Sequence, residues 1–129
     1  MVNFTSPRVN VNISTKNLYN KLIDLNNLVD ILPSNISEFQ SSTNSCSFKI
    51  GHLPKIHLEI SQKIPNSKII YIAKDSKIPF TLECNISEES NKTNVALEIN
   101  AELNMMMKMM LEKPLSNFLD YTSQKLSKL

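Results

Sequence analysis

The 129-residue sequence contains one glycine, no tryptophan, two cysteines and two histidines. A single glycine excludes the glycine-rich loops that hold phosphates, and with them dinucleotide and P-loop chemistry. Aromatic residues make up only 6% of the chain, which argues against stacking platforms for single-stranded nucleic acid. The net charge of +2 comes from scattered basic residues, so neither a nucleic acid nor an anionic membrane is expected as a partner.

No segment of the sequence is typical of a secretion signal or a membrane span. The N-terminus lacks a basic start followed by an apolar core, and no apolar run approaches the ~20 residues of a spanning helix. We therefore expect a cytoplasmic protein without integral membrane association, in which Cys46 and Cys84 are reduced. Both cysteines lie far from any second Cys or His at metal spacing, which predicts structural thiols and no metal site.

The first third of the chain predicts a strand followed by two short helices. Apolar and polar residues alternate within residues 4–13, the pattern of a strand. Ser14 or Thr15 then supplies an N-cap oxygen, and residues 18–25 give the first helix an apolar face. Two asparagines interrupt this helix, and a second short helix ends at Pro33.

Between residues 36 and 103 the apolar residues recur at every second position, which predicts strands. Turn residues at 51–54, 65–66, 75–76 and 88–91 divide this region into about six strands. Short turns between successive strands favour an antiparallel meander. Residues 69–73 are apolar on both faces, which predicts a central strand or one covered twice.

Residues 105–129 predict one long amphipathic helix, which Asn104 can cap. The residues on its inward face recur at three- and four-residue steps: Met107, Leu111, Leu115, Phe118, Thr122, Leu126 and Leu129. One face of the sheet must be buried, and only this helix is large enough to cover it. The sequence therefore predicts a single α+β domain over residues 1–129.

This order of elements resembles the START-like or helix-grip superfamily, also called Bet v 1-like or SRPBCC, the polyketide cyclase/dehydrase and lipid transport group. The segment from Asp24 to Pro33 looks like the step that ends the first helix in such domains, although the proline after the aspartate is missing. Residues 104–115 look like the last strand running into the gripping helix. The resemblance covers nearly the whole chain and implies a helix-grip fold, a curved sheet around the closing helix with a cavity between them.

Members of this superfamily bind lipids, sterols, quinones or polyketides, and some act as chaperone partners or ribosome-associated factors. The fold alone therefore does not decide the function.

Residues 105–110 contain five of the six methionines. Methionine is flexible and polarizable, and it suits surfaces that accept varied apolar partners. Helical geometry predicts that Met106, Met107 and Met110 face inward, as a plastic cavity wall or as ordinary core filling. Met105 and Met109 fall toward the polar side, where a neighbouring loop or a protein partner would explain them. Pro114 predicts a bend within the helix.

No catalytic set can be assembled from the sequence. His52 lies in a predicted turn and His57 on a polar strand face, so we expect both in solvent, away from any cavity. The strand glutamates alternate outward, and they are Glu59, Glu83, Glu98 and Glu102. Tyr71 is the best polar handle on the inner face, because a buried hydroxyl needs a partner, either a ligand oxygen or a backbone carbonyl.

We therefore expect binding or transport of an apolar small molecule between the sheet and the closing helix, without catalysis, cofactor or metal. The predicted apolar lining is Phe48, Leu58, Tyr71, Leu82, Met106, Met110 and Phe118, with Leu28 and Ile31 at the mouth. One alternative is a protein-interaction module with a filled core, which would use Met105 and Met109. Another is a cyclase- or hydrolase-type enzyme, which requires an inward acid or base that the sequence does not provide.

Overall fold

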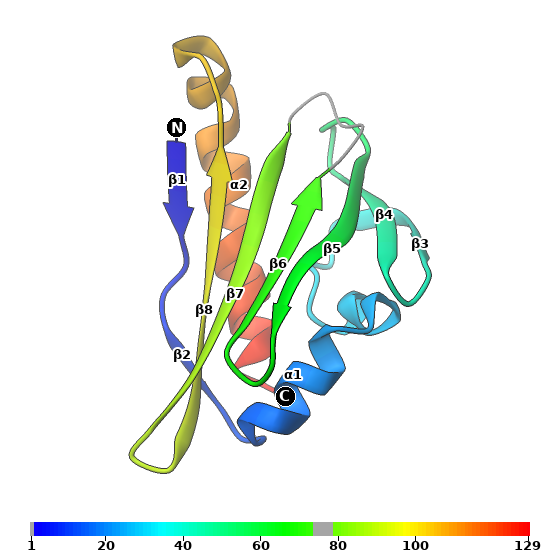
Figure 1. Ribbon diagram of the computed structural model, residues 1–129. Helices are drawn as coiled ribbons and strands as arrows, with labels where there is room; N and C mark the ends of the chain where they lie inside the picture. The colour runs from blue at the N-terminus through cyan, green and yellow to red at the C-terminus, as the bar shows by residue number, and fades with distance from the viewer. Residues whose placement is uncertain (1, 74–78) are drawn as a thin grey trace.

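The computed structural model describes residues 2–73 and 79–129. This part of the chain forms one eight-stranded antiparallel sheet with a long helix packed on one face (Figure 1). The elements are, in chain order, β1 (Val2–Thr5), β2 (Val9–Val11), α1 (Thr15–Leu22), the 3₁₀ helix η1 (Leu25–Asp30), β3 (Ile36–Ser41), β4 (Ser45–Ile50), β5 (Ile56–Ile64), β6 (Lys68–Ala73), β7 (Phe80–Glu89), β8 (Lys92–Ala101) and α2 (Met105–Leu126). The predicted α+β helix-grip fold is confirmed.

The strands lie in the order β1-β8-β7-β6-β5-β4-β3, and β2 also pairs with β8. Strands β3 to β8 form the predicted meander of about six strands. The predicted strand over residues 4–13 was wrong in extent, because β1 and β2 pair with different parts of β8. Pro7 lies between them and has no N–H for the ladder. Ser6 spans this gap, since its N–H donates to the Leu97 carbonyl and its hydroxyl accepts from the Leu97 N–H, both at 2.9 Å.

Positive φ angles mark three of the predicted turns. Ser90 and Asn91 have φ of 53° and 63° and form the two-residue turn between β7 and β8, as a type I′ hairpin requires. Asn66 has a φ of 61° between β5 and β6, and Gly51 has a φ of 51° between β4 and β5. These turns are where the sequence predicted them. The turn predicted at 75–76 lies outside the described residues.

The predicted helix starts are confirmed by their capping bonds. Ser14 Oγ accepts a hydrogen bond from the N–H of Asn17 at 3.1 Å, and Asn104 Oδ1 accepts one from Met107 at 2.8 Å. Each side chain pairs an N–H that the first helical turn would leave unpaired. The helices α1 and η1 are the predicted short pair, and both end before Pro33.

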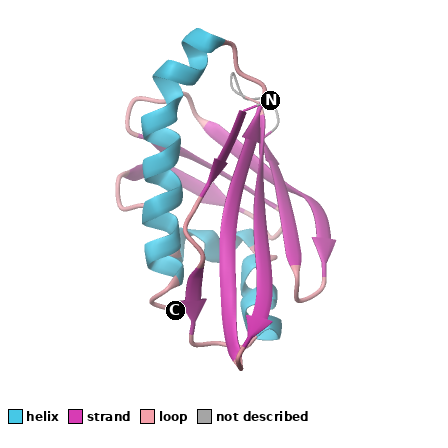
Figure 2. Cartoon of the chain, turned by 90° about the vertical axis from the view of Figure 1, so that its left-hand side faces the viewer, coloured by secondary structure: helices cyan, strands magenta, loops and turns pink. Residues whose placement is uncertain are grey.

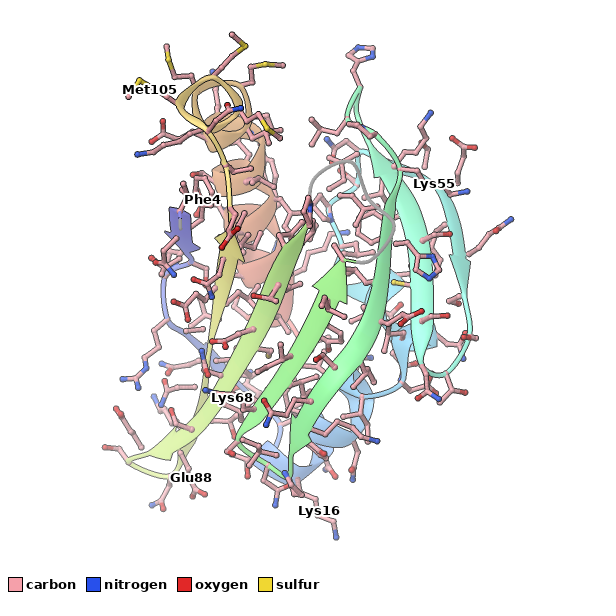
Figure 3. The ribbon with its side chains drawn as sticks, turned by 45° about the horizontal axis from the view of Figure 1, so that its top comes forward. Phe4, Lys16, Lys55, Lys68, Glu88 and Met105 are labelled. Atoms are coloured by element: carbon pink, nitrogen blue, oxygen red, sulfur yellow. The ribbon has the colours of Figure 1, made fainter. Side chains whose placement is uncertain are left out.

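Helix α2 covers the inner face of the sheet with its predicted apolar stripe. The buried α2 residues are Leu111, Leu115, Phe118, Leu119, Thr122, Ser123 and Leu126. Met107 and Leu129, at the two ends of the stripe, are half-buried against the same core. The first turns of α2, around Met105, extend past the end of the sheet (Figures 2 and 3). The inward face of the helix is therefore fully buried from Leu111 onward and half-buried at Met107, while Met105, Met106, Met109 and Met110 are exposed.

Candidate ligand-binding site

A small cavity lies in the interior between the sheet and the helices. Six of the nine predicted lining residues do line it, and they are Leu28, Ile31, Leu58, Tyr71, Leu82 and Phe118. Its volume is about 20 Å³, enough for one water molecule but not for a lipid. The sequence therefore identified residues that meet in space, but the space between them is almost filled.

Phe48 is buried beside this cavity and supports one of its walls. Its ring stacks on that of Phe118, with centroids 6.4 Å apart and planes 9° from parallel. Phe39 stacks on Phe48 at 6.5 Å. Such offset aromatic pairs favour a fixed ring orientation. The stack fixes the side chain of Phe118 on α2 against Phe48 on strand β4.

The expected inward placement of Met106 and Met110 was wrong. Their exposed fractions are 72% and 68%, close to the 80% and 76% of Met105 and Met109. Helical periodicity specifies a face of the helix but not where along its length the sheet begins. Because α2 starts beyond the end of the sheet, these four residues have no surface to pack against. We call Met105, Met106, Met109 and Met110 the methionine patch.

A larger open space lies between α2 and the turn that joins β4 to β5. Its volume is about 620 Å³, and we call it the α2 groove. It is lined by Pro33, Asn35, Ile50, Gly51, His52, Leu53, Met110, Lys113, Pro114, Asn117, Phe118 and Tyr121. Met110 and Phe118 are the two predicted lining residues that it contains.

Two backbone irregularities border the α2 groove. Gly51, with its positive φ, gives the tight turn on the sheet side. Pro114 on the helix side has no N–H, so the Met110 carbonyl loses its usual helical donor. The sequence signals were present in the single glycine and the helical proline. What sequence reasoning missed is that these positions, 63 residues apart in the chain (51 to 114), border one groove.

The groove combines apolar surface with a few polar groups at its outer edge. Leu53 and the Phe118 ring supply apolar walls, while the side chains of His52, Lys113 and Asn117 are exposed to solvent. His52 is in the turn and exposed, as predicted, although it also borders the groove. The arrangement suits a molecule with an apolar body and a polar end.

Tyr71 is used inside the protein. It shares the inner face of β6 with Ile69 and Ala73, while Ile70 and Ile72 face outward and are half-exposed. Its hydroxyl donates a 2.7 Å hydrogen bond to the carbonyl of Leu22. Burial, with smaller contributions from the neighbouring Cys84 and Cys46 thiols, raises the pKa of Tyr71 well above its usual value. Of the two predicted partners, the backbone carbonyl is the one present.

The two cysteines are free and buried, as predicted. Burial raises the pKa of each thiol to about 12, so neither is a thiolate at neutral pH. Among the described residues there is no group of three His, Cys, Asp or Glu side chains that could hold a metal ion. Within the same residues, no helix is both long and apolar enough to span a membrane.

A pair of carboxylates lies on the outer face of the sheet, opposite to the cavity. Glu83 on β7 is directly across from Glu98 on β8. Burial, the hydrogen bond with Glu98 and its charge raise the pKa of Glu83, and Lys68 partly offsets this. Asn3 donates side-chain hydrogen bonds to Glu98 and to Asn100. These carboxylates face away from the α2 groove, so they supply no acid or base to it.

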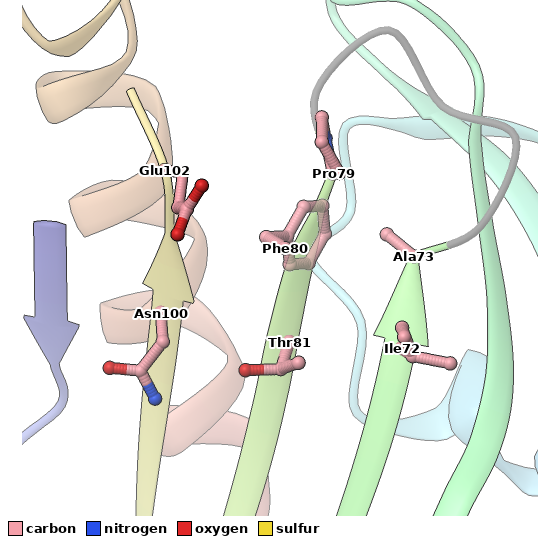
Figure 4. A pocket seen from close by; sticks show the side chains of 7 residues that line it. All are labelled: Ile72, Ala73, Pro79, Phe80, Thr81, Asn100 and Glu102. Atoms are coloured by element: carbon pink, nitrogen blue, oxygen red, sulfur yellow. The ribbon is translucent and has the colours of Figure 1, made fainter. Parts of the chain in front are cut away.

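A shallower pocket of about 290 Å³ lies at the end of strands β6, β7 and β8 (Figure 4). Its walls are Ile72, Ala73, Pro79, Phe80, Thr81, Asn100 and Glu102. The chain between Ala73 and Pro79 is outside the described residues, so the outline of this pocket is incomplete. The α2 groove is bounded by described residues and is the better candidate site.

An antiparallel meander with a C-terminal helix packed on one face, and with a groove beside that helix, defines a helix-grip fold. Solved structures share this fold. The chain is similar to the KanY protein (16% identity, TM-score 0.76, covering 98% of this chain and 95% of that one). It is also similar to XoxI from Bacillus cereus (15% identity, TM-score 0.67, covering 98% of this chain and 96% of that one). A third similar structure is Aha1 from Colwellia psychrerythraea, solved as a dimer (19% identity, TM-score 0.62, covering 98% of this chain and 97% of that one). No protein-family model and no curated protein sequence matches the chain. Identities this low establish the fold alone.

Proposed function

We propose that the protein binds or transports an apolar small molecule, such as a lipid, a quinone or a polyketide-like compound, in the α2 groove. We assign it no catalysis, and we place this function in the cytoplasm. The observation that carries the proposal is the groove itself, about 620 Å³ between helix and turn. Ligand sites are typically concave, mostly apolar and roughly 300–1,000 Å³ in volume.

The groove, and not the interior cavity, accommodates the body of the ligand. The cavity's 20 Å³ has room for one small group only. Of the described residues, Phe118 alone lines both spaces. Rotation of its ring would join them, at the cost of its stacking contact with Phe48. A Phe118 ring that is stacked on Phe48 would therefore leave the core filled while the groove beside it still binds a ligand.

The polar groups at the outer edge favour an amphiphile. His52, Lys113 and Asn117 are exposed, so the polar end of a ligand bound near them stays hydrated. Its apolar part would contact Leu53 and the Phe118 ring. Burying apolar surface there supplies most of the affinity, and the polar contacts fix the orientation.

A thermal-shift titration tests the proposal with decanoate, a soluble quinone and a sterol. Binding to the native state alone raises the melting temperature by mass action, so at least one of these should shift it upward with concentration. Met110→Glu, which puts a charge beside the groove, should remove most of this shift. Met105→Glu is the matched control, because it makes the same change on the same helix outside the groove.

Two results would contradict the proposal. One is the absence of any shift with all three compounds. The other is an equal loss of the shift in Met110→Glu and Met105→Glu, which would mean that the groove does not select the ligand.

The methionine patch favours a second function, a protein-interaction module. Four methionines that are 68–80% exposed lie together on the projecting end of α2. Exposed apolar patches of this kind commonly mark protein contacts, and methionine adapts to varied partners. The structurally similar Aha1 was solved as a dimer, so a second copy of this chain is the first partner to test.

Sedimentation velocity separates the two functions. If the patch is a contact between copies, the wild-type protein should self-associate, and Met105→Glu with Met109→Glu should make it monomeric. The same double variant should retain the decanoate-induced thermal shift if the groove binds ligand. A wild-type protein that stays monomeric at high concentration would contradict self-association through this patch.

A further inference from the structure

Thr122 carries a buried hydroxyl that has no partner. It lies on the inward face of α2, is 2% exposed and lines the interior cavity. Within the part of the chain that the structure describes, no group hydrogen-bonds to its Oγ1. Buried polar atoms are nearly always hydrogen-bonded, so an unpaired one in a cavity wall points to a missing partner.

Two nearby serine hydroxyls, Ser123 on α2 and Ser127 at its C-cap, differ from Thr122 in having backbone partners. Ser123 donates to the carbonyl of Asp120 at 2.9 Å, and Ser127 donates to that of Gln124 at 2.6 Å. Hydroxyls within helices ordinarily take such backbone carbonyls one turn earlier. Thr122 does not, although it is as buried as Ser123. Its hydroxyl therefore remains available to a group inside the cavity.

The chemistry of the cavity limits what that group can be. The walls are mainly aliphatic, including Leu28, Leu58 and Leu97. The Tyr71 hydroxyl already donates to Leu22, and the Cys84 thiol is a weak hydrogen-bonding group. No Lys, Arg or His is among the residues that line the space. A charged group would thus be buried without a counter-ion, which is strongly unfavourable, whereas one neutral oxygen fits the volume.

We propose that Thr122 anchors the uncharged oxygen, a hydroxyl or carbonyl, of an apolar ligand whose body lies in the α2 groove. This inference rests on the proposed function and names the ligand's chemical class. Phe118 lines both the groove and the cavity, and in this proposal its ring turns aside when the oxygen enters. The oxygen then hydrogen-bonds to Thr122 Oγ1, while any charged end of the ligand remains outside near Lys113.

Calorimetric titration with naphthalene, a naphthol and a naphthoate tests this anchor, because the three share one apolar body. Wild-type protein should bind naphthol more tightly than naphthalene by about tenfold, the ratio that one buried hydrogen bond supplies. Thr122→Val keeps the side-chain shape without the hydroxyl. It should lower naphthol affinity to that of naphthalene and leave the affinities for naphthalene and naphthoate unchanged.

Ser123→Ala is the matched control, since it removes an equally buried hydroxyl that already has a backbone partner. It should leave the preference for naphthol intact. Thr122→Val should also fold with unreduced stability, because it removes an unpaired polar group. Urea denaturation of this variant checks that a loss of binding is not a loss of folding.

Each failure has its own meaning. If none of the three compounds binds, both the proposed function and the anchor are wrong. If naphthol and naphthalene bind the wild type equally, or Thr122→Val keeps the preference, the groove binds ligands but Thr122 does not select them. If Thr122→Val is clearly less stable and wild type shows no preference, a buried water occupies the site, and the anchor is overturned.

Discussion

The Tyr71 hydroxyl donates to the carbonyl of Leu22 at 2.7 Å, which ties the last residue of α1 to the middle of strand β6. A helix leaves its last carbonyls without intrahelical donors, and this one is buried where water cannot pair it. Tyr71→Phe removes the donor and should destabilise the protein by about 1–3 kcal/mol, the cost of a buried unpaired acceptor. Urea denaturation measures the loss. Tyr121→Phe, at a position that is 52% exposed, should leave the free energy of unfolding nearly unchanged; an equal effect at both sites would contradict this role.

Leu111 is the first fully buried residue of α2. Leu111 is 4% exposed, and Leu111→Ala should lower the free energy of unfolding by roughly 2–5 kcal/mol, as for other buried leucines. Met109, two residues earlier, is 76% exposed. Met109→Ala should change stability by less than about 0.5 kcal/mol. A loss near zero for Leu111→Ala in chemical denaturation would mean that the helix is not packed on the sheet.

The buried thiols should be inert in the folded protein. Burial holds the pKa of Cys46 and Cys84 at about 12, so almost no thiolate is present at pH 8. We expect no reaction with a thiol reagent under native conditions and two labelled cysteines per chain in urea. Mass spectrometry counts the labels. Rapid labelling of either cysteine in the native protein, or a native disulfide, would contradict the prediction.

The facing carboxylates on the outer sheet face predict a pH-dependent stability. The pKa of Glu83 is raised in the folded state, so its contribution is fully present below the unfolded-state pKa and is lost as pH rises through the folded-state pKa. The raised pKa of Glu83 therefore makes the folded state less stable at neutral pH than in acid. Glu83→Gln should raise the melting temperature at pH 7, and the gain should vanish in acid.

Glu98→Gln should also raise the melting temperature at pH 7, because it removes the carboxylate that faces Glu83. Melting temperatures measured from pH 3 to pH 8 test both variants. A gain that is as large in acid as at neutral pH would show that the effect does not come from this ionisation.

Much of the fold could be predicted because each strand obeys a local rule. In β4 and β6 every second residue is buried, as alternation requires when one face of a sheet is covered. The caps Ser14 and Asn104 follow from side-chain chemistry at adjacent positions. Such patterns depend on a few neighbouring residues, so the sequence carries them directly.

The candidate site was harder to predict from the sequence than the fold, because the site depends on contacts between distant segments. The inner-face residues Leu58, Tyr71 and Leu82 were identified from alternation, but the cavity volume depends on how Phe118 stacks on Phe48. The exposure of Met106 and Met110 depends on where the sheet ends relative to α2, which periodicity does not encode. The groove itself exists only where the β4–β5 turn approaches Pro114 in space.

The most direct test of ligand binding in the α2 groove is a backbone amide NMR titration of the 14.7 kDa protein with decanoate. The proposal predicts chemical-shift changes that saturate with ligand and cluster at His52, Leu53, Lys113, Asn117 and Tyr121, the walls of the groove. Amides of the pocket at the end of β6, β7 and β8, such as those of Ile72 and Thr81, should not respond. The contradicting result is a set of shifts confined to that pocket or to the methionine patch, or no saturable change at any residue.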